Sequence, residues 1–195
     1  MSTVQKPVWL RLTHWLNAVA IVVLTLSGWR IYNASPFFDF SFDRDYTLGG
    51  WLGGALLWHF AAMWLLGASF AIYLLANLVG GRLWRQFLPV SPAAVVSDLV
   101  AALSGRLVHD DSGRYNAVQK LAYLGVMVLS VLAIASGLVL WKSVQFPLLR
   151  TLLGGYDNAR VVHFLAMAGF VAFFAVHVVM VALVPKSLLP MIRGR

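Results

Sequence analysis

The sequence contains no cysteine, and only 11% of its 195 residues are charged. The absence of cysteine excludes disulfide bonds, cysteine-ligated iron–sulfur clusters and a covalently attached haem c. Soluble domains carry about 25% charged residues, whereas this chain is 61% hydrophobic with a mean hydropathy of +0.80. All seven acidic residues are aspartates outside the long apolar runs, so no carboxylate pair is available for chemistry inside a membrane.

The sequence instead contains four long apolar runs. A membrane-spanning helix needs about 20 apolar residues, and the runs predict transmembrane helices at roughly 9–31, 50–79, 119–141 and 160–184. An amphipathic segment at about 91–105 is expected to lie on the lipid surface, and the connection after the third run is expected to hold another short interfacial helix. We therefore predict an all-α integral membrane protein, a four-helix bundle forming a single domain over residues 1–195.

The charge distribution predicts the orientation of this bundle. The net charge of +8 would indicate nucleic acid in a soluble protein, but here lysine and arginine concentrate in loops on one predicted side. The positive-inside rule then places both termini in the cytoplasm. Asp39, Asp43 and Asp45 lie in the first connection, on the opposite side. The chain is expected to contact membrane lipid and not to bind nucleic acid.

Four of the five histidines lie inside the apolar runs: His14, His59, His163 and His177. Ionisable residues inside a membrane are costly and mark function by default. His163 and His177 are fourteen residues apart on one run, which is about 21 Å along a helix with a rotation of roughly 40° between them. They share one face at two depths, so a single metal ion cannot bind both.

The predicted topology pairs these histidines by depth. His59 and His163 fall near the external side, and His14 and His177 near the cytoplasmic side. Each pair joins two helices at one level, which favours axial ligation of the iron of a flat macrocycle, giving an outer and an inner haem b. Six-coordinate iron moves electrons without binding substrate directly. A lone intramembrane histidine is often a packing residue, but four that pair by depth are not explained that way.

Other residues support this hypothesis less specifically. His109 lies on the cytoplasmic connection and is interpreted as a solvated loop residue. Arginines near helix ends can pair with haem propionates or extend to the lipid headgroups. Glycines in the runs allow a helix or a porphyrin face to approach closely, and ordinary helix packing explains them equally well. These residues are Arg11, Arg30, Arg160, Gly28, Gly67, Gly125, Gly137 and Gly169.

Three stretches carry a resemblance to a known family. They are RLTHWLNAVAIVVLTLSG around His14, WHFAAMW around His59, and VVHFLAMAGFVAFFAVH with His163 and His177. The chain resembles the bacterial cytochrome b561 superfamily, which includes the b-type subunits of nickel–iron hydrogenases and respiratory formate dehydrogenases. The resemblance implies two non-covalent b haems and electron exchange with membrane quinone. GRYNAVQKLAYLGVMVLSVLAIASGLVLW and GGYDNARVVHFLAMAG are similar to a subgroup paired with periplasmic molybdopterin oxidoreductases.

The expected function is electron transfer across the bacterial cytoplasmic (inner) membrane, as part of a respiratory chain. Electrons would pass between the quinone pool and a periplasmic oxidoreductase, of molybdopterin type or a cytochrome. The chain would be an electron-transfer subunit without a catalytic residue of its own. One alternative is a stand-alone oxidoreductase acting on quinone and a small reductant such as superoxide. A transporter with histidine proton carriers and a structural anchor are further alternatives.

Overall fold

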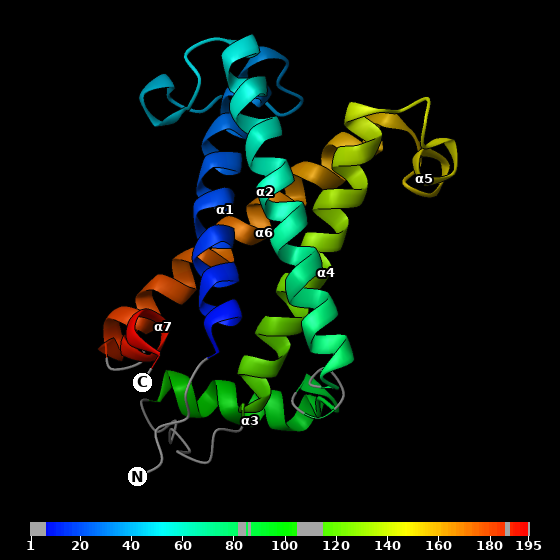
Figure 1. Cartoon of the computed structure of the whole chain (residues 1–195). Coiled ribbons are helices and arrows are strands. Elements are labelled where there is room, and N and C mark those ends of the chain that lie inside the picture. The colour runs from blue at the N-terminus through cyan, green and yellow to red at the C-terminus, as the bar shows by residue number, and fades with distance from the viewer. Residues whose placement is uncertain (1–6, 82–84, 86, 105–114, 186–187, 195) are drawn as a thin grey trace. The chain divides into compact units, whose positions relative to one another are not determined.

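The computed structural model of the chain describes residues 7–81, 85, 87–104, 115–185 and 188–194, and this part is helical without strands (Figure 1). Four helices are long and apolar enough to cross a membrane: α1 (Val8–Ala34), α2 (Leu52–Val79), α4 (Ala117–Trp141) and α6 (Tyr156–Leu183). The shorter helices are η1 (Arg44–Tyr46), α3 (Pro92–Leu103), α5 (Pro147–Leu152) and α7 (Leu189–Arg193). The predicted all-α class with four spanning helices is confirmed.

The chain divides into two compact units. The α1–α2 unit comprises the described residues of Gln5–Leu74 and Val184–Arg195, and therefore holds α1, η1, most of α2 and α7. The α4–α6 unit comprises those of Leu75–Leu183, which include the end of α2 and α3 to α6. The single domain expected from the sequence stays a prediction.

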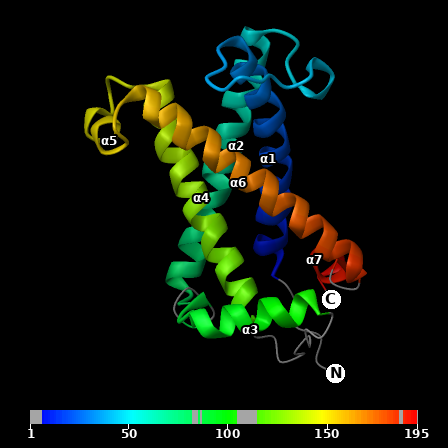
Figure 2. The same ribbon diagram turned by 180° about the vertical axis from the view of Figure 1, so that it is seen from behind.

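In the α4–α6 unit, α4 and α6 pack against each other near the end where α5 connects them and diverge toward their other ends (Figures 1 and 2). Ser136 of α4 contacts His163 of α6, and Leu129 of α4 lies against Gly169 of α6. A lower number on α4 pairs with a higher number on α6, so the two helices are antiparallel. Small side chains at the crossing allow the close approach that packing in lipid requires.

Short helices flank this pair at its two ends. α3 is the helix expected in the segment 91–105, whose last residue lies outside the described part. The carboxylate of Asp98 in α3 accepts a hydrogen bond from the backbone N–H of Ala117 at 2.7 Å, which caps α4. Asn116 and Gln119 form a capping box at the same end. At the other end, α5 is the short helix predicted in the connection after the third apolar run.

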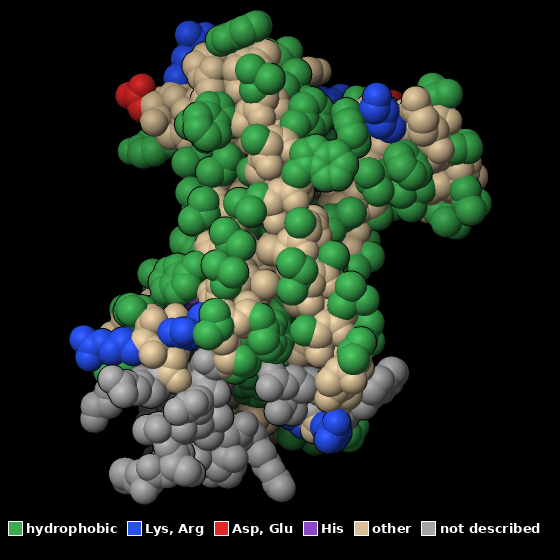
Figure 3. Space-filling view, viewed as in Figure 1, with side chains coloured by type: hydrophobic (Ala, Val, Ile, Leu, Met, Phe, Trp, Pro, Cys, Tyr) green, Lys and Arg blue, Asp and Glu red, His purple; other side chains and the backbone are tan. Residues whose placement is uncertain are grey.

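The side chains that face outward from the spanning helices are mainly apolar. Leu57 of α2 is 73% exposed and Leu165 of α6 is 56% exposed. In Figure 3, hydrophobic side chains cover most of the face shown, and charged side chains lie near the helix ends. Such a surface would be costly in water and is favourable against lipid tails. The chain is therefore a multi-pass integral membrane protein.

In the α1–α2 unit, α1 and α2 form an antiparallel hairpin. Ser27 contacts His59 at one level, and Asn17 hydrogen-bonds to Ser69 at another. The end of the connection lies against α1, where the backbone N–H of Leu48 donates to the carbonyl of Leu26 at 3.0 Å. Gly49 follows with φ +106°, where an added Cβ would clash with the backbone nitrogen of Ala55. This tight turn sets where α2 begins, and hence the level of His59.

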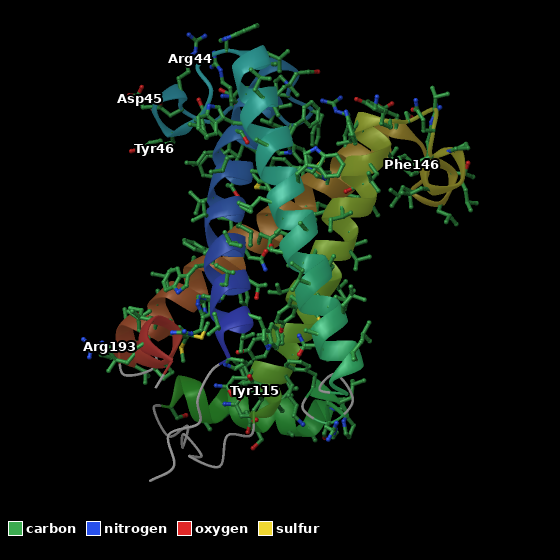
Figure 4. The ribbon with its side chains drawn as sticks, in the orientation of Figure 1. Arg44, Asp45, Tyr46, Tyr115, Phe146 and Arg193 are labelled. Atoms are coloured by element: carbon green, nitrogen blue, oxygen red, sulfur yellow. The ribbon has the colours of Figure 1, made fainter. Side chains whose placement is uncertain are left out.

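The loop of residues 35–51 is ordered by aromatic side chains. Phe42 stacks on Trp29 with ring centroids 4.5 Å apart, and the amide of Asn33 hydrogen-bonds both the N–H and the carbonyl of Phe42. Tyr32, only 6% exposed, packs against three phenylalanines of the loop. Figure 4 shows the side chains of η1 projecting from the outer side of the loop. The loop therefore has a defined shape with polar groups facing outward.

The short helix α7 is fixed to the start of α1. Arg11 donates from Nη1 to the carbonyl of Ile192 at 2.9 Å, and Trp15 donates from Nε1 to the carbonyl of Met191 at 3.2 Å. These carbonyls lie at the C-terminal end of a helix, where no intrahelical donor is available. The two α1 side chains therefore cap α7.

Candidate haem-ligating site

The four intramembrane histidines are divided equally between the two units. His14 on α1 and His59 on α2 belong to the α1–α2 unit, whereas His163 and His177 both lie on α6. His59 lies opposite Ser27, which is thirteen residues beyond His14 on α1. At about 1.5 Å per residue the two levels in this hairpin are about 20 Å apart. His109 lies outside the described residues.

The His59 ring is held by two consecutive residues of α1. Its Nδ1 lies 3.0 Å from the hydroxyl oxygen of Ser27, and its Cε1 would lie 3.5 Å from a Cβ added to Gly28. Ser27 is fully buried. The small glycine beside the serine leaves room for the imidazole to approach α1.

The hydrogen-bond network assigns the tautomer of His59. The Ser27 hydroxyl lies 2.6 Å from the carbonyl of Val23, and a carbonyl can only accept a hydrogen bond. The single hydroxyl proton of Ser27 goes to that carbonyl, so its oxygen accepts from the Nδ1–H of His59. The lone pair of the ring is then on Nε2, the nitrogen able to bind a metal.

His163 shows the same arrangement in the α4–α6 unit. Its Nδ1 lies 3.0 Å from both the hydroxyl oxygen of Ser136 and the carbonyl of Ala133. Because a carbonyl only accepts, Nδ1 must carry the proton and Nε2 the lone pair. Ser136 is fully buried and donates to the carbonyl of Leu132 at 2.5 Å. The following residue, Gly137, faces the Cε1 of His163, at 3.2 Å from an added Cβ.

The two remaining histidines contact aromatic rings. His177 stacks on Phe173 with centroids 5.7 Å apart and planes 10° apart. The ring of His14 meets the edge of Trp15 at 5.3 Å. Trp15 also caps α7, so the C-terminal helix supports the neighbourhood of His14. Arg11, an expected propionate partner, uses Nη1 for α7, while its buried Nε has no hydrogen-bond partner among the described residues.

These residues fit a b-type haem. An axial imidazole needs a lone pair on one nitrogen and an acceptor for the N–H on the other, and His59 and His163 meet both conditions. Trp29, beside Gly28, buries its Nε1 with no hydrogen-bond partner in the described part of the chain. A buried donor without an acceptor costs about 1–3 kcal/mol, so an acceptor from outside the chain, such as a propionate, would satisfy it.

The predicted pairs, His59 with His163 and His14 with His177, each join the two units, and they stay a prediction. Among the described residues no three potential metal ligands gather at one place, whereas an axial pair requires only two. Ser27 and Ser136 were not singled out from the sequence. A serine followed by glycine within a spanning run is the signal that could have found them.

Comparison with known proteins decides the family. The profile of the family described as prokaryotic cytochrome b561 matches residues 6–194. The chain belongs to the prokaryotic cytochrome b561 family. A curated relative from Azospira oryzae is 60% identical over 188 residues, which is 96% of this chain and 95% of that protein. It is described as "Putative protein-methionine-sulfoxide reductase subunit YedZ1".

Membership of this family makes the chain a membrane cytochrome, and a cytochrome b carries b-type haem and transfers electrons. The resemblance recognised in the sequence is therefore confirmed. The four helices that can span a membrane agree with this assignment.

Proposed function

We propose that this cytochrome b561 holds two b haems and relays electrons across the cytoplasmic membrane, between quinone and a periplasmic oxidoreductase. His59 and His163 would hold the outer haem, and His14 and His177 the inner one. The observation that carries the proposal is the pair of equivalent imidazoles, His59 and His163, whose Nδ1 atoms each contact a buried serine hydroxyl, joined at His163 by the carbonyl of Ala133. Such imidazoles are prepared for metal ligation through Nε2.

The spacing of the histidines supports the pairing by depth. The α1–α2 hairpin separates its two histidine levels by thirteen residues, and α6 separates its two by fourteen. The two separations, about 20 and 21 Å, differ by one residue rise. The two separations therefore agree with the proposed pairing by depth.

The residues of the chain have separate tasks in this proposal. Haem iron with two imidazole ligands supplies one-electron transfer and has no open position for substrate. The four histidines would hold the iron atoms, and Ser27, Ser136 and Ala133 orient the rings of His59 and His163 so that Nε2 is available. Apolar helix surfaces exclude water from the path between the two levels. We place both termini in the cytoplasm, which puts the outer pair near the periplasm.

The printed name of the relative supports the identity of the partner. That protein is described as a subunit of a methionine-sulfoxide reductase. We propose a periplasmic partner of the same kind, a molybdopterin oxidoreductase that reduces methionine sulfoxide. Electrons would then flow outward, from quinol to the periplasmic partner. The ordered loop with exposed Asp39, Asp43 and Asp45 offers a surface for that partner.

The direct test is substitution of an outer histidine. His163→Ala should remove one of two haems and leave the other with an unchanged spectrum, measured as haem per protein and as the reduced-minus-oxidised difference spectrum. His109→Ala, the histidine outside the spanning runs, is the matched control and should retain both. Retention of both haems in His163→Ala would contradict the assignment. Steady turnover of superoxide by the isolated chain would favour the stand-alone oxidoreductase.

A further inference from the structure

Ser27 and Ser136 are equivalent residues in the two units. Each lies within a spanning helix directly before a glycine, and each is fully buried. Each donates its hydroxyl proton to a carbonyl four residues earlier and accepts from the Nδ1–H of a histidine on the neighbouring helix. The two serines lie on different helices, α1 and α4, and they contact the two histidines that are assigned to one haem.

We propose that Ser27 and Ser136 are positioning residues that fix both axial histidines of the outer haem and lower its midpoint potential. The inference rests on the proposed function, because it assumes that His59 and His163 bind iron. A hydrogen bond from Nδ1–H to an oxygen increases the basicity of the ligating nitrogen. A more basic ligand favours ferric over ferrous iron, and hydrogen bonding around the iron is one of the means by which a protein sets its potential.

Helix packing alone does not account for the two contacts. A buried serine in a spanning helix commonly bonds the carbonyl four residues earlier. Ser130, also on α4, makes this bond to Val126 at 2.8 Å and, in the described part of the chain, contacts no histidine. A serine is therefore satisfied without a histidine. The additional contacts of Ser27 and Ser136 serve the imidazoles.

The two histidines differ in one respect that sharpens the test. His163 has the carbonyl of Ala133 as a second acceptor at 3.0 Å, in addition to Ser136. Removal of the Ser136 hydroxyl leaves this carbonyl in place, so the Nδ1–H tautomer persists. Ser136→Ala should therefore keep the outer haem while weakening the hydrogen bonding of its ligand. The midpoint potential of the outer haem then measures the effect of the serine hydroxyl, separately from any effect on haem content.

The experiment is a redox titration of the full-length chain in detergent, followed at the haem absorbance bands. Ser27→Ala and Ser136→Ala should each raise the midpoint potential of the outer haem, and the inner haem should be unchanged. A shift in the ferric-to-ferrous ratio of about three- to tenfold corresponds to roughly 30–60 mV for one electron. Ser130→Ala is the matched control on α4 and should leave both potentials unchanged.

The outcomes separate this inference from the proposed function. Outer-haem potentials equal to the wild type in both alanine variants would overturn the role of the serines, while a normal haem content would leave the proposed function intact. If an alanine variant loses the haem, Ser27→Cys or Ser136→Cys decides, because cysteine keeps the side-chain volume and weakens the acceptor. A raised potential in the cysteine variants supports the inference, and an unchanged potential contradicts it. Loss of neither haem in His163→Ala would contradict the proposed function instead.

Discussion

At the scale of single residues, the site depends on small side chains beside large rings. Gly28 and Gly137 each face the Cε1 of a histidine on the neighbouring helix, and the serine before each glycine holds the Nδ1 of the same ring. Gly169 has a different task, because an added Cβ there would lie 2.8 Å from a methyl group of Leu129. The glycines in the spanning runs are therefore of at least two kinds, ring contacts and helix contacts.

The two ring-facing glycines should respond differently to alanine. In Gly137→Ala the new Cβ lies 3.2 Å from the His163 ring, closer than ordinary contact, so the ring must shift. In Gly28→Ala the distance to the His59 ring is 3.5 Å, which is ordinary contact. We expect Gly137→Ala to change the outer-haem spectrum or reduce its content, and Gly28→Ala to resemble the wild type.

Gly125→Ala controls for the general effect of alanine in α4, because no described atom lies within 4 Å of its added Cβ. Absorbance and electron paramagnetic resonance spectra of the oxidised protein give the readout. A stronger effect at Gly28 than at Gly137 would contradict the geometry.

The sequence predicted the histidines but not the residues that hold them. An imidazole inside an apolar run is visible from composition and cost alone. Which serine faces that imidazole depends on how two helices are aligned, and the contacts between Asn17 and Ser69 and at Gly49 determine the alignment of α1 and α2. Such alignments are tertiary, so the spacing of residues in one helix does not reveal them.

At the scale of elements, the loop between α1 and α2 is held by the end of α1. Asn33 donates to the carbonyl of Phe42 at 2.7 Å and accepts from its N–H at 2.9 Å, bonds that a backbone partner would otherwise supply. Phe42 also stacks on Trp29, next to the glycine that faces His59. The loop proposed to meet the periplasmic partner is therefore anchored close to the outer histidine.

Asn33→Ala should loosen this loop without loss of haem. Two hydrogen bonds of about 0.5–1.5 kcal/mol each are removed, so amide hydrogen exchange in residues 35–47 should accelerate by roughly tenfold or more. Hydrogen-exchange mass spectrometry of the protein in lipid nanodiscs measures the change. Asn158→Ala removes a comparable side-chain bond on α6, to Gly154, and should leave exchange in the loop unchanged. Equal exchange in Asn33→Ala and wild type would contradict the role of Asn33.

The long elements were predictable, whereas two of the four short helices, η1 and α7, were not. Four runs of apolar residues determine four spanning helices, because composition decides insertion into lipid. The helix α3 followed from local signals, Ser91 as an N-cap and Pro92 at the first helical position. In contrast, α7 is five residues long and receives its caps from Arg11, 181 positions away in the sequence. No local pattern indicates such a cap.

At the scale of the whole molecule, each of the two helical units supplies one of the two histidines of each proposed haem site. The α1–α2 unit supplies His14 and His59, and the α4–α6 unit supplies His163 and His177. In the proposed pairing, each haem takes one histidine from each unit. A ligand that binds only the folded protein stabilises it by mass action.

The central claim is that the histidines pair by depth, and haem stoichiometry in double variants tests it most directly. Two haems per chain are expected in the wild type. His59→Ala combined with His163→Ala removes both ligands of one haem, so one haem should remain, as in either single variant. His59→Ala combined with His177→Ala removes one ligand from each haem, so none should remain. A wild-type ratio of one, or loss of both haems when His59 and His163 are replaced together, would contradict the account.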